Sequence, residues 1–214
     1  LLNGLESRTG LRFRDDQRSD TIATIVRVMT RRGLRSAAEA NMALDQDPSV
    51  LDELVNQLTV GETYFFREPR QFDFIRRTVL PDVIKRRGIG HPIRAWSAGC
   101  ASGEEAYSLA IVFAEEHWSR HAEILATDIS AAALDKARQA VFRPWSFRGE
   151  SMARVAAHGT QADDLFRLHD HVRSRVTFRN LNLASGHYPK MGETTDLDSV
   201  SYTHLTLPTK NEVE

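Results

Sequence analysis

The sequence predicts an α/β protein in which a small helical domain precedes a parallel β-sheet. Between residues 1 and 57, apolar residues recur at helical spacing and are bounded by capping signals, which indicates helices. From residue 92 onward, short apolar runs alternate with longer amphipathic segments, a pattern typical of parallel strands joined by crossover helices. Because ligands of such sheets bind where the strands end, we expect a functional site at the carboxyl edge of the sheet.

The composition narrows the class of protein. The 214 residues are 41% hydrophobic and 27% charged, as in a soluble globular protein, and a net charge of −1 gives no overall attraction to nucleic acid or membranes. The single cysteine, Cys100, excludes an internal disulfide and a multi-cysteine metal site, and we expect no metal. No apolar stretch approaches the roughly 20 residues of a membrane span. We expect a cytoplasmic protein and, since an initiator Met is lacking, a fragment.

Three helices are predicted within the first 57 residues. The first begins with Ser19 as its N-cap and ends at Gly33. Its predicted buried stripe, at spacing i, i+3, i+4, i+7, comprises Ile22, Ile25, Val26 and Met29. Ser36 and Ser49 each begin a capping-box pattern that opens a further helix. The buried stripe of the last helix comprises Leu51, Leu54, Val55 and Leu58.

A group of arginines marks the end of the first helix. The group comprises Arg27, Arg31, Arg32 and Arg35. One interpretation is a solvated face whose cations complement the helix C-terminus. The other is a surface for an acidic partner. The residues alone leave both interpretations open.

The sheet is predicted from the segments that follow Pro69. Pro69 is expected at the first position of a helix that carries Phe72 and Ile75 and continues to Gly88. The next elements are a strand in "PIRAWSAG", a helix in "GEEAYSLAIVFAEEHW", a strand in "AEILATDIS", a helix in "AAALDKARQAVF" and a third strand at residues 175–183. Beyond Ala184 no further strand–helix unit is recognised, so we expect residues 185–214 to be a non-native or disordered tail.

The turn after the first strand, "SAGCASGEE", has the composition of a ligand-binding loop. Its small residues, Gly99 and Gly103 among them, allow the backbone to approach a ligand closely. The dinucleotide pattern G-x-G-x-x-G is absent, and the carboxylates of Glu104 and Glu105 disfavour a pyrophosphate at this helix start. The loop therefore indicates a ligand that is neutral or cationic and donates hydrogen bonds. Cys100 in this loop is interpreted as a small buried residue rather than a nucleophile.

Polar residues also follow the second and third predicted strands. Asp128 ends the second strand, where a carboxylate can accept both hydroxyls of a ribose. Alternatively, Asp128 caps the following helix together with Ser130. The stretch "NLNL", residues 180–183, ends the third strand. An Asn there can pair with an adenine edge or simply form a turn.

Four long motifs resemble those of the CheR-type chemotaxis receptor methyltransferases, which are protein-glutamate O-methyltransferases that use S-adenosylmethionine. The motifs are "QLTVGETYFFREPRQF", "IRAWSAGCASGEEAYSLAI", "ILATDISAAALDKARQAVFRPWSFRG" and "VTFRNLNL". The resemblance runs from about residue 8 to 184 and is most specific between residues 58 and 149. It implies a small helical domain at residues 1–57 and a partial Rossmann-like, class I S-adenosylmethionine-dependent methyltransferase domain at residues 58–184.

The resemblance also implies roles for individual residues. The cofactor-binding set would be Thr63, Arg67, Gly99, Glu105, Asp128, Asn182 and Leu183. Arg67 would also be catalytic by orienting the substrate or the cofactor, with Tyr64 as a lining residue. Arg27, Arg31 and Arg32 would bind the acidic cytoplasmic helices of a chemoreceptor, and neither nucleic acid nor membrane insertion is implied.

The segment "TYFFR" is expected to lie between two environments. Phe65 and Phe66 would anchor the link between the helical domain and the sheet. Thr63 and Arg67 would face the opposite way, toward the cofactor.

The sequence departs from the family in several places. A family asparagine is replaced by Gly61, and the motif D-x-I-x-C-R-N-V, whose Asn-Arg pair helps to hold the cofactor, is absent after Ala184. We also expect the family's small β-subdomain to be missing. Two alternatives stay open: a non-catalytic module that binds the cofactor, and a methyltransferase that acts on another protein or a small molecule.

Overall fold

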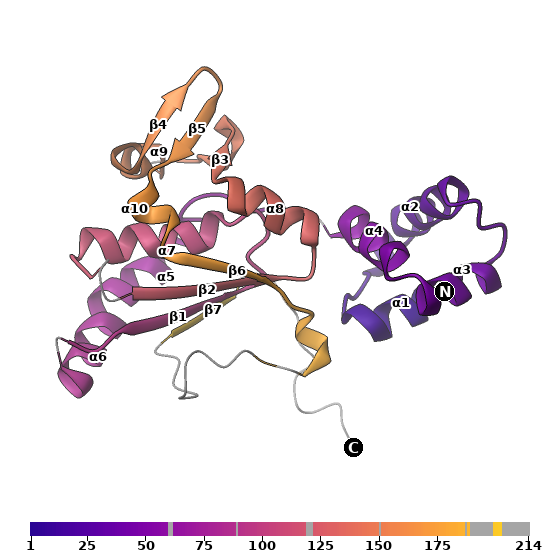
Figure 1. Ribbon diagram of the computed structural model, residues 1–214, viewed down its shortest axis with the longest axis horizontal. Helices are drawn as coiled ribbons and strands as arrows, with labels where there is room; N and C mark the ends of the chain where they lie inside the picture. The colour runs from indigo at the N-terminus through magenta and orange to yellow at the C-terminus, as the bar shows by residue number, and fades with distance from the viewer. Residues whose placement is uncertain are drawn as a thin grey trace.

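The computed structural model describes residues 1–59, 62–88, 90–118, 122–149, 151–186, 188 and 199–202. An N-terminal group of α-helices lies beside a larger part built on a parallel β-sheet (Figure 1). The predicted fold class, a small helical domain followed by a Rossmann-like sheet, is confirmed. The domain boundary near residue 57 stays a prediction, and Gly61 lies outside the described residues.

The N-terminal helices pack around one small apolar core. They are α1 (Leu2–Thr9), α2 (Arg18–Arg31), α3 (Ala37–Gln46) and α4 (Pro48–Leu58), with a 3₁₀ turn at Asp15–Gln17 before α2. The buried side chains of this core are Leu5, Ile25, Val28, Leu44, Val50 and Leu54. Removing these side chains from water is the main stabilising contribution to such a bundle.

Of the three predicted N-caps, one is confirmed. Ser36 Oγ accepts a hydrogen bond from the Glu39 amide at 3.1 Å. Ser19 is not a cap, since α2 already begins at the residue before it. Ser49 lies inside α4, which Asp47 caps by accepting from the Ser49 amide at 3.0 Å. A proline at the first position of α4 follows Asp47, and this start signal prevails over the capping-box pattern.

The predicted buried stripe of α2 is wrong at two positions. Ile22 and Val26 are 47% and 52% exposed, whereas Ile25 and Val28 are buried. Several overlapping stripes fit the same helical period, and packing against α4 selects one of them.

The helix predicted from Pro69 is confirmed and reaches Arg87. It consists of α5 (Pro69–Phe74), a π-helical turn (Ile75–Val79) and α6 (Leu80–Arg87). The π turn ends just before Pro81, which lacks the amide that an α-helix would use there. Phe72 and Ile75 are buried, as predicted.

The central sheet has four parallel strands in the order β6-β2-β1-β7. The strands are β1 (Ile93–Ala98), β2 (Ala122–Asp128), β6 (Val176–Asn180) and β7 (Ser199–Tyr202). Helix α7 (Glu104–Glu115) connects β1 to β2, and α8 (Ala131–Gln139) follows β2. The first strand in the chain therefore lies between the second and the fourth, and the strand order reverses between β1 and β7. Doubly wound sheets bind ligands at such a reversal.

Strand β7 corrects the expectation of a tail without a strand. Ser199–Tyr202 pairs in parallel with residues 95–98 of β1. A short strand that contains two serines carries little apolar signal, and its pairing with a buried neighbour makes it a strand. Most of the predicted tail otherwise lies outside the described residues.

A second, antiparallel sheet lies within residues 141–168, and the expectation that the family's small β-subdomain is missing after Ala184 stays a prediction. Its strands are β3 (Val141–Phe142), β4 (Gly159–Ala162) and β5 (Leu165–Leu168), in the order β3-β5-β4. The short helices α9 (Ser151–Val155) and α10 (Asp170–Arg173) flank it, and it projects from the main sheet in Figure 1. Its strands are only two to four residues long, so any apolar alternation is too short to recognise in the sequence.

The aromatic pair of "TYFFR" packs into the core of the sheet. Phe65 and Phe66 are 0% and 6% exposed and belong to the main apolar cluster. The Phe65 ring stacks on Phe147 at a centroid distance of 5.2 Å, and Phe66 lies edge-on to Phe72 at 5.1 Å. Phe65 and Phe66 therefore hold the segment to the sheet. Neither belongs to the separate apolar core of the helical domain.

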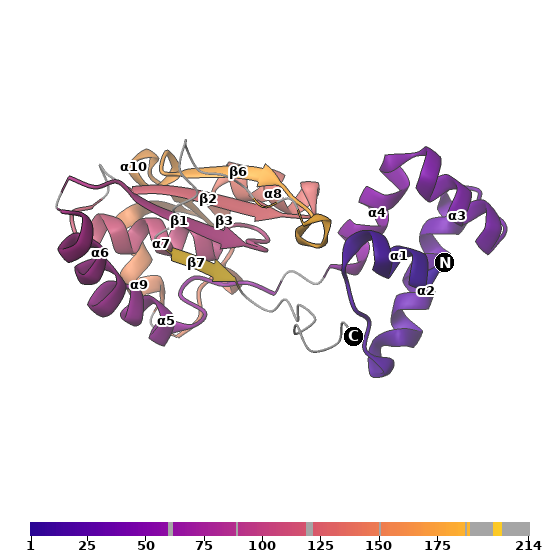
Figure 2. The same ribbon diagram turned by 90° about the horizontal axis from the view of Figure 1, so that it is seen from below.

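Two contacts join the helical domain to loops that follow strands. Ser130 Oγ donates to Asn56 Oδ1 at 2.6 Å, and Asn182 Nδ2 donates to the Arg8 carbonyl at 2.5 Å. Figure 2 shows the strands of the main sheet pointing toward the N-terminal helices. The carboxyl edge, where we expect the site, is thus the edge that the helical domain approaches.

Candidate functional site

The loop after β1 folds back on β2. The amides of Gly99 and Cys100 donate to the Thr127 carbonyl at 2.8 and 2.9 Å. Gly99 and Gly103 have φ values of 74° and 94°, which glycine adopts without strain. A Cβ on Gly103 would lie 3.0 Å from Ala137 Cβ, so this glycine also lets α7 begin close to α8. The loop thus brings backbone, rather than side chains, to the point where the strand order reverses.

Asp128 connects the two loops that follow β1 and β2. Its Oδ2 accepts from the Ala101 amide and its Oδ1 from the Ser130 amide, each at 2.8 Å. The side-chain cap of α8 is Ser130, which accepts from the Ala133 amide. A carboxylate offers about four lone-pair sites, so Asp128 retains acceptor capacity for a ribose diol. Burial raises the pKa of Asp128 above its ordinary value of 3.8.

Beside this loop lies a small hollow that opens to solvent. Its lining residues are Thr63, Tyr64, Arg67, Glu68, Gln71, Phe72 and Glu105. The fold therefore brings together three predicted site residues of "TYFFR", Thr63, Tyr64 and Arg67, with Glu105 from the start of α7.

The hollow is lined by opposite charges that neighbours hold in place. Glu105 is 6% exposed, and its Oε1 accepts from Ser97 Oγ at 2.6 Å. Arg67 donates to the Glu62 carbonyl, and its Cζ lies 5.8 Å from the centroid of the Tyr64 ring. A carboxylate and a guanidinium in one hollow suit a ligand that carries both an ammonium and a carboxylate.

A buried hydrogen-bonded chain lies behind the hollow, and its centre, Glu104, is not among the predicted site residues. Glu104 is 0% exposed, and its carboxylate accepts from Ser146 Oγ at 2.9 Å and from Ser102 Oγ at 2.8 Å. Its carbonyl accepts from Ser108 Oγ at 2.7 Å. Burial raises the pKa of Glu104, while the bonds from the serines oppose the shift. The motif "GEE" contains the residue but does not show which glutamate points inward.

The same chain continues to the backbone of "TYFFR". Ser108 Oγ accepts from the Phe66 amide at 3.0 Å, and the Ser146 carbonyl accepts from the Phe65 amide at 2.9 Å. Phe66 has a φ of 54°, which a phenylalanine adopts only when its surroundings hold it there. The two bonds therefore fix the direction in which the next residue, Arg67, meets the hollow.

Asn182 and Leu183 are not brought to the hollow. Asn182 donates to the Arg8 carbonyl at the end of α1. Leu183 packs on the apolar cluster that contains Trp96. Asn180, at the end of β6, lies next to the end of β2, where its Nδ2 donates to the Asp128 carbonyl at 3.2 Å. The roles of Asn182 and Leu183 in cofactor binding stay predictions.

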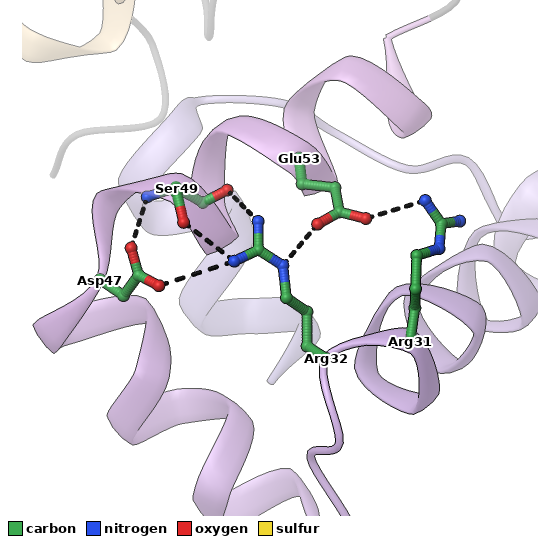
Figure 3. Close-up of polar contacts among 5 residues, drawn as sticks. All are labelled: Arg31, Arg32, Asp47, Ser49 and Glu53. Carbon is green, nitrogen blue, oxygen red and sulfur yellow. Dashed lines mark hydrogen bonds and ion pairs between the residues drawn. The ribbon is translucent and has the colours of Figure 1, made fainter.

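Two of the three arginines predicted to bind substrate are engaged within the helical domain (Figure 3). Arg32 donates from Nε to Glu53 at 2.5 Å and from Nη1 to Ser49 Oγ at 2.9 Å. Arg31 donates to the other oxygen of Glu53 at 2.9 Å. These bonds tie the end of α2 to the first half of α4. Arg27 is exposed on α2, and the role of the three arginines in substrate binding stays a prediction.

Three further features of the described part of the chain concern metal ligands, the cysteine thiol and membrane-spanning helices. Its residues include no group of three or more His, Cys, Asp or Glu side chains that could hold a metal ion. Burial, and then the charges of Asp128 and Glu105, raise the pKa of the Cys100 thiol, which disfavours a thiolate nucleophile. None of the helices described is both long and apolar enough to cross a bilayer.

Comparisons with known proteins give this site a context. A family model described as "CheR methyltransferase, SAM binding domain" matches residues 61–199. Chemotaxis protein methyltransferase 2 of Vibrio cholerae is 38% identical over 138 residues, which cover 62% of this chain and 47% of the relative. A chemotaxis protein methyltransferase of Borreliella burgdorferi is 34% identical over 146 residues, 65% of this chain and 52% of the relative. Chemotaxis protein methyltransferase 1 of Pseudomonas aeruginosa is 29% identical over 198 residues, 88% of this chain and 72% of the relative.

The extent of these matches bears on the C-terminal end of the predicted methyltransferase domain. The chain spans about half the length of the first two relatives. The family match passes Ala184 and reaches the first residue of β7, so the family likeness extends beyond the range that the motifs indicate.

Proposed function

The chain belongs to the CheR methyltransferase family, and on that premise we propose that it transfers a methyl group to glutamate side chains of chemoreceptors. The family's domain indicates S-adenosylmethionine as the methyl donor. The product of the proposed reaction is a glutamate methyl ester. The names of the relatives, which are chemotaxis protein methyltransferases, support methylation in chemotaxis.

The observation that carries the proposal is the hollow that Glu105 and Arg67 line together. S-adenosylmethionine carries a sulfonium, an ammonium and a carboxylate. Glu105 suits the cationic groups, and Arg67 suits the carboxylate of either the donor or the acceptor. Asp128 retains lone pairs for the ribose hydroxyls. The residues present therefore fit this donor better than a phosphate, which the two buried glutamates would repel.

The chain's own part in the reaction is placement and desolvation. When bound, S-adenosylmethionine supplies an electrophilic methyl group on a sulfonium, which becomes a neutral thioether once a carboxylate oxygen has taken the methyl. An acceptor glutamate is already ionised near pH 7, so no residue has to remove a proton from it. Glu105 and Asp128 would hold the donor, and Arg67 would orient a carboxylate. Thr63, which is 6% exposed, and Tyr64 would exclude water that otherwise solvates the acceptor.

We propose that the partner is the acidic cytoplasmic helices of a chemoreceptor and that Arg27 contacts them. Arg27 is exposed on α2, whereas Arg31 and Arg32 are paired with Glu53. This partner also places the protein in the cytoplasm. A positive charge that is free of an internal carboxylate is the more available one for an acidic helix.

The test is a methyl-transfer assay with labelled S-adenosylmethionine and a peptide from a chemoreceptor methylation helix. The expected result is label on the peptide that is released by mild alkali, as methyl esters are, and that is lost when the acceptor glutamate is replaced by glutamine. Donor binding without transfer to the peptide would contradict the proposal and favour a non-catalytic binding module. Transfer only to another protein or a small molecule would keep the enzyme class and change the substrate.

A further inference from the structure

Two guanidiniums meet one carboxylate beside the hollow. Arg148 Nη1 donates to Glu62 Oε1 at 3.2 Å, and Arg67 Nη2 lies 3.9 Å from Glu62 Oε2. The Cζ atoms of Arg148 and Arg67 lie 4.7 and 5.8 Å from the centroid of the Tyr64 ring. Both guanidiniums are thus within cation–π range of a single aromatic side chain, which helps to hold them beside the carboxylate. We refer to Arg67, Arg148, Tyr64 and Glu62 as the carboxylate bridge.

The two arginines of the carboxylate bridge face different surroundings. Arg67 lines the hollow together with Glu105, and its side chain is 22% exposed. The side chain of Arg148 is 50% exposed and does not line the hollow. Arg67 therefore belongs to the side where the proposed donor binds. Arg148 is the more exposed of the two and is therefore open to a carboxylate that arrives from solvent.

The geometry points to Arg148 as the residue that binds the carboxylate of the methyl-accepting glutamate, with Glu62 occupying that place in the substrate-free chain. This inference rests on the proposed function. A guanidinium offers a planar fork of donors that matches a carboxylate, and Glu62 already shows that a glutamate side chain fits between the two arginines. Tyr64 would lie beside the acceptor once it is bound, where an aromatic ring excludes water.

The ion pair between Glu62 and Arg148 is exposed, so another carboxylate can displace Glu62. Its side chain is 54% exposed, and it pairs with an arginine that is half exposed as well. Ion pairs in such positions contribute little to stability because water solvates both partners well when they separate. A substrate carboxylate held by many further contacts can therefore replace Glu62 at small cost. Glu62 and Arg148 are 86 residues apart in the chain, so only the fold reveals the pair.

The test compares four substitutions in the full chain, one of them a control. Arg148→Ala is expected to raise the KM for a receptor-helix peptide about tenfold, the usual effect of losing a charge-assisted hydrogen bond, and to leave the Kd for S-adenosylmethionine unchanged. Arg148→Lys restores the charge without the planar fork and should recover part of the loss. Glu62→Gln removes the competing carboxylate and should lower the peptide KM. Arg143→Ala, which removes an exposed arginine five residues earlier, is the matched control and should leave the KM unchanged.

Binding without turnover provides the second readout. The anisotropy of a fluorescent receptor-helix peptide is measured in the presence of S-adenosylhomocysteine, and Arg148→Ala should weaken this binding. Equal weakening in Arg143→Ala would reveal a general charge effect and overturn the inference. A higher Kd for S-adenosylmethionine in Arg148→Ala, or a higher peptide KM in Glu62→Gln, would overturn it as well. An unmodified chain that binds the donor but neither binds nor methylates the peptide would contradict the proposed function itself, and the inference with it.

Discussion

At the scale of single residues, Glu104 is expected to position Arg67 through a chain of hydrogen bonds, without contacting Arg67 itself. Its carboxylate accepts from Ser102 and Ser146, and the same chain of bonds reaches the backbone beside Arg67. Glu104→Ala is expected to weaken S-adenosylmethionine binding about tenfold and to lower the free energy of unfolding by about 2 kcal/mol, because the buried hydroxyl of Ser146 and the partly buried hydroxyl of Ser102 lose their acceptor. Calorimetry measures the affinity, and urea denaturation measures the free energy of unfolding.

Glu104→Gln separates positioning from charge. Glutamine can still bond both hydroxyls, so the affinity for the donor is expected to stay within about threefold of the unmodified chain. Burial raises the pKa of Glu104, so its ionised form costs stability at pH values above the unfolded pKa. The glutamine variant should therefore be at least as stable at neutral pH. Glu115→Ala, at the other end of α7, is the control; donor binding that falls equally in this variant would count against the role of Glu104.

Asp128 should make donor binding depend on pH. Burial raises its pKa above 3.8 in the free chain, and hydrogen bonds from ribose hydroxyls favour its ionised form. The affinity for S-adenosylmethionine is therefore expected to fall as the pH falls through this raised pKa. Titration calorimetry from about pH 4 to pH 8 measures the effect, and Asp128→Asn should bind weakly with a flatter profile. An affinity of the unmodified chain that stays constant over this range would contradict the role.

The sequence predicts the residues that touch the hollow better than those that support it. Thr63, Arg67 and Glu105 belong to long motifs, and the structure brings all three together. Glu104 is adjacent to Glu105, but only the position of each on α7 decides which one is buried in the hydrogen-bonded chain. Arg148 lies far along the chain from its partner, so no local pattern reveals it.

At the scale of elements, Arg32 holds the corner between α2 and α4. Its bonds to Glu53 and Ser49 are partly shielded, and Arg32→Ala is expected to lower the free energy of unfolding by about 1 kcal/mol. Arg27→Ala removes the same charge from an exposed position, so it should change stability by less than about 0.5 kcal/mol while slowing methylation of a receptor peptide. Denaturation and methylation rates check the pair, and the reverse pattern would contradict this division of roles.

The sequence predicts the type of an element correctly where its apolar pattern extends over many residues. The crossover helix α7 and the strands β1 and β2 are predicted with the correct order because their apolar runs are long. Strand β7 and the small antiparallel sheet are missed because each strand is short and depends on a partner distant in the chain.

At the scale of the whole molecule, the helical domain is coupled to the edge of the sheet that carries the site. Ser130 lies two residues after Asp128; its amide donates to the Asp128 carboxylate and its hydroxyl donates to Asn56 of α4. Donor binding at Asp128 is therefore expected to slow amide hydrogen exchange in α4, and Asn56→Ala should reduce this protection. Hydrogen exchange followed by mass spectrometry measures it; equal protection in both chains would exclude coupling through this contact.

The central claim is that S-adenosylmethionine binds in the hollow lined by Thr63, Arg67 and Glu105. Calorimetric titration tests it most directly, with the unmodified chain, Glu105→Ala and the control Glu123→Ala, whose exposed carboxylate pairs with Arg94 on the neighbouring strand. The account predicts binding to one site in the unmodified chain and the control, and a loss of at least about tenfold in Glu105→Ala, because a buried carboxylate beside a cationic ligand is removed. Equal affinity of Glu105→Ala and the unmodified chain would contradict it.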